Sequence, residues 1–312
     1  MPAVQAATTG AAAAPPASSD VVEDLFGFLR VLGDGTVLRS PAGPAFCPTT
    51  FPESHPSVQW KEAVYDKAKN LRVRMYKPVA SGEAGKTKLP VLVHFHGGGF
   101  CLGSCTWANV HAFCLRLAAD AGAVVLSAGY RLAPEHRLPA AVDDGAGFLR
   151  WLRDQSAANN ASWLAEAADF RRVFVTGDSA GGTIAHHLAV RGAAGELDAV
   201  VAVRGYVLLM PFFGGVIRTP SEAECPAEFW RLSLPAGATR DHPVANPFGP
   251  ESPGLDAVEF PPRLAAMGKP VELAEFAGEP HGFYTLDPGS AATGELIRAV
   301  SRFVDAASKA DA

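Results

Sequence analysis

The chain has 312 residues, of which 48% are hydrophobic and 19% are charged, so it can build a large buried core. Its formal net charge is -5 and its basic residues are scattered, which argues against a nucleic-acid or acidic-lipid partner. No apolar run reaches the length of a membrane span, so we expect no membrane-spanning segment.

Residues 1–19 are rich in Ala, Pro, Ser and Thr and contain no charged side chain. This composition predicts a disordered N-terminus. It lacks the basic n-region and apolar core of a signal peptide, and the arginines of a transit peptide, so we expect a cytoplasmic protein. No central linker interrupts residues 20–312, which predicts a single domain.

The five cysteines are odd in number, and their spacing matches no common zinc site. We therefore expect reduced and mostly buried thiols. They are Cys47, Cys101, Cys105, Cys114 and Cys225.

Apolar side chains recur at helical spacing from Val21 to Leu32, and a Gly-Asp-Gly sequence at residues 33–35 then breaks the pattern. This spacing predicts a short amphipathic helix, whose apolar face must be covered. The helix can pack on the core, or it can form a lid over an apolar pocket. The sequence leaves both interpretations open.

A weak alternation over Gln59 to Lys77, with a polar turn in its middle, predicts an antiparallel hairpin. After a buried strand over Leu89 to Phe95, segments with strand and helix patterns alternate along the chain. Strands separated by helices predict an α/β fold, in which a mostly parallel sheet has helices on both faces. The further predicted strands are 123–127, 173–176, 205–210 and 271–276, and the predicted helices are 110–121, 140–154, 182–191 and 294–307.

The sequence GDSAGG at residues 177–182 follows a strand pattern and leads into a helix pattern. A G-x-S-x-G sequence between a strand and a helix is typical of a nucleophile elbow, where a strained turn exposes the serine hydroxyl. The flanking glycines leave room that a Cβ would fill. Ser179 is therefore the candidate nucleophile. The alternative is a glycine-rich loop that only turns the chain.

A second glycine-rich sequence, HGGGF at residues 96–100, directly follows the predicted strand over Leu89 to Phe95. Ester hydrolysis passes through a tetrahedral intermediate, whose negatively charged oxygen can be stabilised by fixed backbone N–H groups. We expect these groups to come from the loop glycines and from the residue after the nucleophile. The candidates are Gly97, Gly98, Gly99 and Ala180, with His96 as part of the motif.

Two other interpretations of this loop remain open. One is an ordinary glycine turn. The other is a metal site at His94 and His96, although no carboxylate or third histidine lies near them in the sequence.

The general base is expected near the C-terminus, if the chain follows the order Ser, acid, His. His281 has this position, between the last predicted strand and the last predicted helix. Its imidazole can take the Ser179 proton and return it to the leaving alcohol. We assign His136, His186 and His187 to surface or core positions.

The chain resembles the hormone-sensitive-lipase-like carboxylesterases of the α/β-hydrolase fold, especially the plant carboxylesterases. The resemblance rests on HGGGF, on GDSAGG, on YRLAPEHRLPAAVDD over Tyr130 to Asp144, and on a closing HGF. It implies an ester hydrolase that acts without cofactors, with residues 20–45 as part of a cap. It also implies that Asp143 and Asp144 brace loops near the site and do no chemistry.

The triad acid is missing from the place that the resemblance implies. A triad needs an acid to hold the base in the right tautomer, and in the family it follows a buried strand. Here Pro261 and Pro262 forbid a central strand, and the residues before Arg263 leave no room for a strand, an acid loop and a helix. We infer a deletion, either real or from an incorrect gene model. Asp256 is the nearest replacement by spacing, and the weaker candidates are Asp241, Glu259 and Glu279.

The leading hypothesis is a serine carboxylesterase that hydrolyses small to medium apolar esters, because aromatic residues lie in or near the loops around Ser179. They are Phe100, Trp107, Phe212, Phe213, Phe229, Trp230 and Phe283. The second hypothesis is a hormone-binding protein similar to the gibberellin receptors, which lack the base that His281 supplies. The third is a dehydratase of the hydroxyisoflavanone type. The expected partner is a small-molecule ester, with no metal and no cofactor.

Overall fold

The computed structural model describes residues 20–40, 50–79, 88–157, 163–197, 201–215, 227–252 and 271–309. The chain divides into two compact units, Met1–Ala42 and Gly43–Ala312. The predicted disorder of residues 1–19 lies outside the described residues. The assignment of residues 20–45 to a cap stays a prediction.

The described part of the first unit is a small antiparallel sheet, and the helix predicted over Val21 to Leu32 is wrong. Its strands are β1 (Val21–Leu25), β2 (Leu29–Leu32) and β3 (Val37–Arg39). Phe26 and Gly27 both have a positive φ, as a tight hairpin turn requires, and the Gly27 N–H donates to Asp24 Oδ1 at 2.6 Å. Apolar residues are so frequent in this segment that they fit both a helical and a strand period. The turn at Phe26 and Gly27 decides in favour of the hairpin.

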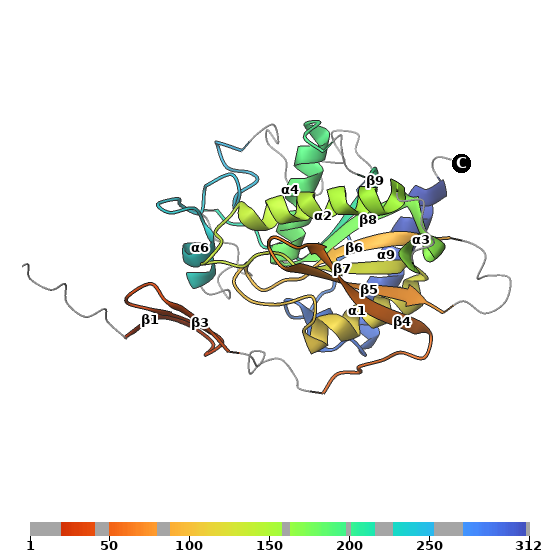
Figure 1. Cartoon of the computed structure of the whole chain (residues 1–312), viewed down its shortest axis with the longest axis horizontal. Coiled ribbons are helices and arrows are strands. Elements are labelled where there is room, and N and C mark those ends of the chain that lie inside the picture. Colours follow the sequence, from red (N-terminus) through yellow and green to blue (C-terminus); the bar gives the residue numbers. More distant parts are fainter. Residues whose placement is uncertain are drawn as a thin grey trace, which may run out of the picture. The chain divides into compact units, whose positions relative to one another are not determined.

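The second unit is built on a six-stranded sheet with the order β4-β5-β7-β6-β8-β9, as far as the chain is described (Figure 1). The β7-β6-β8-β9 part is parallel, and the β4 and β5 strands join it antiparallel at one edge. The predicted hairpin and the predicted, mostly parallel sheet are therefore confirmed. The strands are β4 (Val58–Asp66), β5 (Leu71–Pro78), β6 (Leu89–Phe95), β7 (Val124–Ala128), β8 (Ala168–Asp178) and β9 (Val203–Leu209).

Helices cover both faces of this sheet (Figure 1). On one face α1 packs against α9, and on the other α2 packs against α4. The four long predicted helices are confirmed, with ends that differ by at most three residues. The described helices are α1 (Ala108–Ala121), α2 (Ala140–Ala157), α3 (Trp163–Ala167), α4 (Ala180–Ala193), α6 (Glu228–Ser233), α8 (Phe283–Leu286) and α9 (Ala291–Lys309).

The central strand β6 is buried on both faces because its successive side chains meet different helix layers. The His94 ring lies 5.6 Å from the ring of Phe113 on α1, whereas the Phe95 ring lies 6.3 Å from that of Phe148 on α2. This explains why β6 has a nearly continuous apolar sequence. The end of β6 is thereby held rigidly where the HGGGF loop begins.

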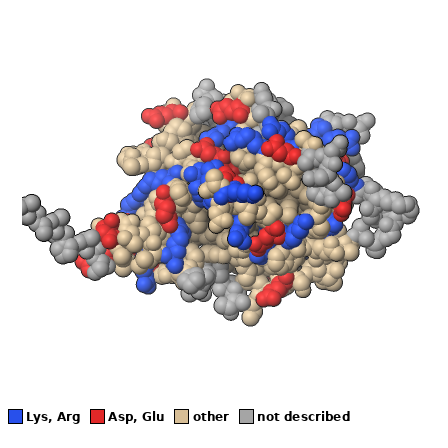
Figure 2. All heavy atoms as spheres, in the orientation of Figure 1, with Lys and Arg blue, Asp and Glu red and all other residues tan. Residues whose placement is uncertain are grey.

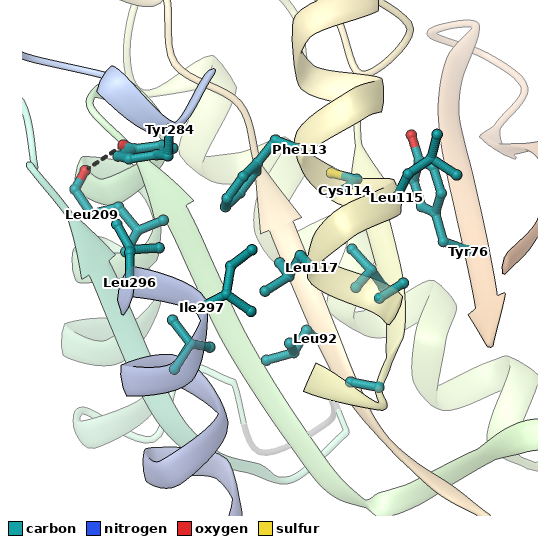
Figure 3. Packing of buried hydrophobic residues seen from close by; sticks show 14 of the residues in the cluster. Tyr76, Leu92, Phe113, Cys114, Leu115, Leu117, Leu209, Tyr284, Leu296 and Ile297 are labelled. Atoms are coloured by element: carbon teal, nitrogen blue, oxygen red, sulfur yellow. Dashed lines mark hydrogen bonds between the residues drawn. The ribbon is translucent and has the colours of Figure 1, made fainter. Parts of the chain in front are cut away.

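One hydrophobic cluster fills the space between the sheet and the α1, α8 and α9 helices (Figure 3). Leu92 of β6, Phe113 and Leu117 of α1, and Tyr284 and Ile297 near the C-terminus are all fully or almost fully buried. Burying each such aliphatic or phenyl side chain contributes about 1.5–3 kcal/mol. This cluster fixes the C-terminal residues against the strands that carry the site.

The strand predicted over Val271 to Phe276 is wrong, because this segment has no regular secondary structure and lies outside the sheet. Leu273 within it is 60% exposed. Among the described residues, β9 is the edge strand on this side and no strand links it to the segment. The inferred deletion falls largely within residues 253–270, which lie outside the described residues.

Basic and acidic side chains are interspersed on the face of the molecule seen in Figure 2. None of the helices in the described ranges combines the length and apolar composition needed to cross a bilayer. Cys101, Cys105 and Cys114 are buried thiols, as predicted. Cys47 and Cys225 lie outside the described residues.

Candidate active site

Ser179 lies half-buried at the sharp turn between β8 and α4, with φ 51° and ψ -115°. A non-glycine residue in this region of backbone space is strained by about 1–3 kcal/mol, so surrounding contacts must hold it. The Ser179 N–H donates to the Leu209 carbonyl at 2.9 Å, and its own carbonyl accepts from the Phe212 N–H at 3.0 Å. The predicted strand–turn–helix arrangement is therefore present and is tied to the end of β9.

Two glycines allow this turn to lie against its neighbours. A Cβ on Gly177 would collide with the backbone of Gly181, and a Cβ on Gly181 would collide with the carbonyl group of Phe95. The start of α4 thus packs directly on the end of β6. Ala180, the first residue of this helix, places its N–H at the positive end of the helix dipole.

The HGGGF loop lies directly beside Ser179. A Cβ on Gly97 would lie 3.2 Å from the Ser179 Cβ and would collide with the Asp178 carboxylate. Gly98 and Gly99 have φ values of 114° and 57°, which favour glycine. The structure therefore brings the triple-glycine loop and Ser179 together, although they are far apart in the sequence.

His96 shapes this loop. Its Nδ1 lies 2.7 Å from the Gly97 carbonyl, and its ring stacks on Tyr130 with centroids 4.4 Å apart. The Tyr130 hydroxyl donates to the His96 carbonyl at 2.7 Å. Burial lowers the pKa of His96 to about 4, so the ring is neutral at neutral pH. It therefore holds the loop as a neutral hydrogen-bond donor.

His281 is exposed in the loop before α8. The next residue, Gly282, has φ 75° and directs its N–H at the Met210 sulfur, 3.3 Å away. Met210 follows Leu209, whose carbonyl holds the Ser179 N–H. The loops that carry Ser179 and His281 thus meet the same end of β9.

The triad acid stays open. Asp256 and Glu259 lie outside the described residues. Asp241 accepts a hydrogen bond from Asn246 Nδ2 at 3.1 Å within a turn, and Glu279 is an exposed loop residue. The role of a solvated loop charge, which the sequence favours for both, agrees with these positions.

Four of the predicted aromatic residues form a wall near the HGGGF loop. The Phe212 and Trp230 rings stack with centroids 4.4 Å apart, and Phe100 packs 5.9 Å from Trp230. A Cβ on Gly99 would collide with the ring of Phe229. All four side chains are buried, so they form a packed aromatic cluster beside the HGGGF loop.

The other three predicted aromatic residues face elsewhere. Phe213 packs on His186 and Phe248, and Trp107 and Phe283 belong to the hydrophobic core under α1 and α8. Trp107 and Phe283 are therefore better described as core residues, and Phe213 is half-buried.

The other histidines have structural positions. His136 is exposed, His186 is buried, and His187 Nε2 lies 2.9 Å from the Val244 carbonyl. In the ranges that the structure describes, no three His, Cys, Asp or Glu side chains gather in a way that could hold a metal ion.

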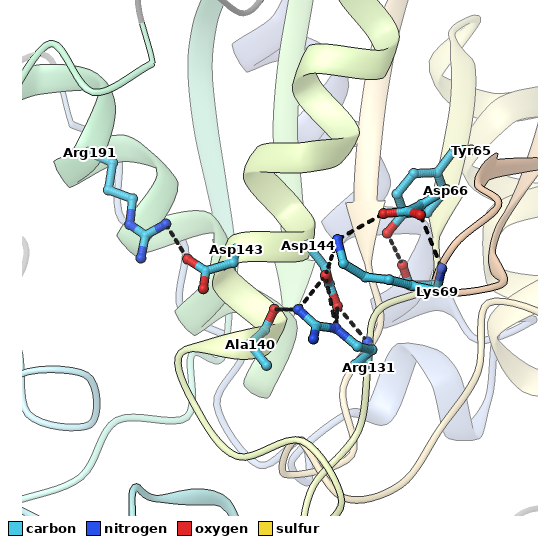
Figure 4. Close-up of polar contacts among 9 residues, drawn as sticks. Tyr65, Asp66, Lys69, Arg131, Ala140, Asp143, Asp144 and Arg191 are labelled. Carbon is cyan, nitrogen blue, oxygen red and sulfur yellow. Dashed lines mark hydrogen bonds and ion pairs between the residues drawn. The ribbon is translucent and has the colours of Figure 1, made fainter.

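Asp144 is the centre of a buried ionic network (Figure 4). Arg131 binds it through two nitrogens at 2.8 Å, and Lys69 approaches its carboxylate at 3.3 Å. Its neighbour Asp143 pairs with Arg191 at 2.7 Å. This network joins the β4-β5 turn, the loop after β7, α2 and α4, in agreement with the bracing role predicted for both aspartates.

One pair of buried residues near Ser179 was not predicted from the sequence. Asp178 and His94 are both buried, and the His94 Nε2 lies 3.3 Å from the Asp178 Oδ1. Asp178 directly precedes Ser179 in the sequence, but only the register of β6 on β8, which places His94 beside Thr176, shows that the two residues meet.

Comparison with known proteins identifies several relatives. Residues 92–263 match a family model described as alpha/beta hydrolase fold. The chain is 40% identical over 239 residues to Probable carboxylesterase 6 of Arabidopsis thaliana, covering 73% of this chain and 69% of that protein. It is 37% identical over 227 residues to the gibberellin receptor GID1C of the same plant, covering 66% of this chain and 63% of the receptor.

Solved structures show the same fold. An esterase from Pyrobaculum calidifontis has a TM-score of 0.62 and 28% identity, covering 80% of this chain and 84% of that one. The esterase LipW from Mycobacterium marinum has a TM-score of 0.64 and 29% identity, covering 81% of this chain and 82% of that one.

Proposed function

Since the chain belongs to the alpha/beta hydrolase fold family and is a carboxylic ester hydrolase, we propose that it cleaves small to medium apolar esters through an acyl-enzyme intermediate. Ser179 is the proposed nucleophile and His281 the proposed base. The single observation that carries this proposal is the contact between the triple-glycine loop at Gly97 and the strained Ser179.

The proposed reaction needs no group other than the chain and water. Ser179 Oγ attacks the ester carbonyl while His281 takes its proton, and the carbonyl oxygen becomes an oxyanion. The N–H groups of Gly98, Gly99 and Ala180 are the proposed donors to this oxygen. His281 then protonates the leaving alcohol, and water attacks the acyl-enzyme by the same route in reverse.

The buried aromatic wall supports an apolar substrate. Phe212, Phe229 and Trp230 present rigid rings beside the oxyanion loop, and burial of an acyl or alcohol group there would remove apolar surface from water. The proposal therefore excludes strongly charged esters as good substrates.

Labelling with a fluorophosphonate probe tests the nucleophile. We expect the native chain to be labelled, and the Ser179→Ala variant and the His281→Ala variant to lose labelling or to react far more slowly. Well-folded native protein that resists the probe would contradict the proposed esterase.

Asp256 is the proposed acid of the triad. We expect Asp256→Asn to lower kcat by about 10⁴-fold, because a triad without its acid loses the correct imidazole tautomer. Glu259→Gln is the matched control in the same stretch and should leave kcat nearly unchanged. An unaltered rate in Asp256→Asn would remove this residue from the triad and support a chain impaired by the loss of its acid.

Similarity to a gibberellin receptor favours binding without catalysis as the second candidate function. In that case the chain would bind a small acidic hormone and turn over no ester. Saturable binding of a gibberellin to a chain that neither reacts with the probe nor hydrolyses esters would favour this alternative.

A further inference from the structure

A row of buried polar side chains crosses the sheet directly beneath the nucleophile. The strand registers place His94 of β6 beside Ser127 of β7 and beside Thr176 of β8. All three are at most 1% exposed. Asp178, two residues after Thr176, continues this row on the same face of β8 and is 6% exposed.

The Asp178 carboxylate lies between His94 and the oxyanion loop. Its Oδ1 is 3.3 Å from His94 Nε2, and its Oδ2 lies so close to Gly97 that a Cβ there would collide with it. The His94–Asp178 contact is an ion-pair distance without hydrogen-bond alignment, since both atoms lack a hydrogen-bond partner within the described ranges. One carboxylate therefore touches an imidazole on one side and the loop that faces Ser179 on the other.

An uncompensated negative charge at this place would oppose catalysis. The transition state of ester hydrolysis gathers negative charge on the carbonyl oxygen, which the proposed mechanism places beside Ser179 and the triple-glycine loop. A buried carboxylate against Gly97 repels that charge strongly, because the interior screens it poorly. The repulsion disappears if the carboxylate and a neighbouring group share a proton.

We propose that His94 is a positioning residue of the esterase site, which holds the Asp178 carboxylate against Gly97 and shares a proton with it, so that the pair is neutral beneath the oxyanion. This inference rests on the proposed function. It assigns no bond-making step to His94, because the imidazole acts only through Asp178 and the loop.

The other ionisable groups that sense the Asp178 charge do not supply a cation at neutral pH. His96 in the loop after β6 is neutral, because burial lowers its pKa to about 4. Burial also raises the pKa of the Cys114 thiol on α1, the Tyr130 hydroxyl after β7 and the Tyr284 hydroxyl on α8, so these groups stay protonated and uncharged. His94 is the described neighbour whose protonation can compensate the carboxylate.

The test compares four proteins: the native chain, His94→Phe, Asp178→Asn and the double variant. Loss of His94 leaves the carboxylate uncompensated, and we expect kcat to fall by about 10- to 100-fold, less than the loss of a whole oxyanion donor. KM should change little, since a neutral ester does not sense the charge until the transition state. Adding Asp178→Asn to His94→Phe removes the charge and should recover at least half of this loss on a logarithmic scale.

The recovery of kcat in the double variant separates a positioning role from a structural one. A purely structural role for His94 would lower the folded fraction, and Asp178→Asn would then recover none of the lost kcat per folded molecule.

His111→Phe is the matched control, because His111 is also a buried histidine, on α1, with Nδ1 3.0 Å from the Tyr76 hydroxyl. It should lower stability, keep kcat per folded molecule, and gain nothing from Asp178→Asn. If His94→Phe does not fold, His94→Gln retains the size and a hydrogen-bond donor, and the same rescue is expected.

The outcomes separate this inference from the proposed function. Native kcat in folded His94→Phe, or a loss that Asp178→Asn does not recover, would overturn the positioning role while the esterase stands. A native chain that neither hydrolyses esters nor reacts with a fluorophosphonate would overturn both. Urea unfolding of the same four proteins measures the coupling of the pair in every case, and additive effects on stability would contradict a direct pairing.

Discussion

Ser179 and Gly97 illustrate how single residues set the geometry of this site. The strained Ser179 backbone is held by hydrogen bonds to Leu209 and Phe212, and Gly97 is the residue that allows a second loop to touch it. Neither residue contributes much to the core. The room that Gly97 leaves, rather than any strong bond, decides whether the Ser179 hydroxyl and the N–H groups of the HGGGF loop lie close together.

Gly97→Ala tests this close approach. The added methyl group would meet the Asp178 carboxylate and the Ser179 Cβ, so the loop must shift away from the nucleophile. We expect kcat to fall by about 10²- to 10³-fold, as when an oxyanion donor is lost. Steady-state kinetics with a nitrophenyl ester would measure it.

The matched control is Gly147→Ala on α2, where a Cβ would meet no atom closer than 4.0 Å. Because alanine is the better helix former, this variant should keep full activity and gain up to about 1 kcal/mol of stability. Equal activity in the two variants would show that the loop tolerates a side chain at Gly97.

At the scale of elements, the Asp144 network joins four segments that approach from different parts of the chain. Asp144 is fully buried and binds Arg131 and Lys69, whereas the Asp143 side chain is 50% exposed and binds Arg191 at the surface. The two adjacent aspartates on α2 therefore differ in what they hold together. The buried Asp144 binds the β4-β5 turn and the loop after β7 to the helix.

We expect Asp144→Ala to lower the free energy of unfolding by about 3 kcal/mol, because it removes the carboxylate that pairs with the Arg131 guanidinium, whereas Lys69 keeps its ion pair with Asp66. The value lies at the lower end of the usual range, since the Arg131 side chain is 25% exposed and water can reach it. Asp143→Ala, which removes a surface ion pair, should cost at most about 1 kcal/mol. Urea denaturation of both variants checks the difference, and equal losses would refute the distinction.

At the scale of the whole molecule, buried neutral histidines couple folding to pH. Burial lowers the pKa of His96 to about 4 and that of His186 to about 3, both below the usual 6.5. The unfolded chain binds these protons more readily than the folded chain. Stability is therefore highest above pH 6.5 and falls as the pH drops towards these lower values.

The expected slope is about 1.4 kcal/mol per pH unit for each such histidine below pH 6.5. His186→Gln should lower this slope by the contribution of one histidine. Urea unfolding at several pH values between about 4 and 7 measures the slope. His136→Gln, at an exposed position, is the control. An unchanged slope in His186→Gln would mean that this histidine is charged in the folded state.

Two predicted elements are wrong because the contact that decides the structure is not contained in the local sequence pattern. Residues 21–32 fit a helical period, yet the positive φ values of Phe26 and Gly27 make a hairpin. Residues 271–276 have a strand-like composition, but a strand forms only beside a paired neighbour, and among the described residues none lies between this segment and β9. Hydrogen bonding between strands is a long-range property that a short window of sequence does not contain.

The sequence by itself determined the α/β order of the main unit, the elbow at Ser179 and the glycine loop at Gly97, because strand period, helix period and glycine requirements are local. Only the tertiary structure decided that the loop touches Ser179 and that the Asp178 carboxylate lies between Gly97 and His94. These contacts depend on the register of β6 against β8, which sets side chains from distant segments on one face. The chemistry of the site follows from that register.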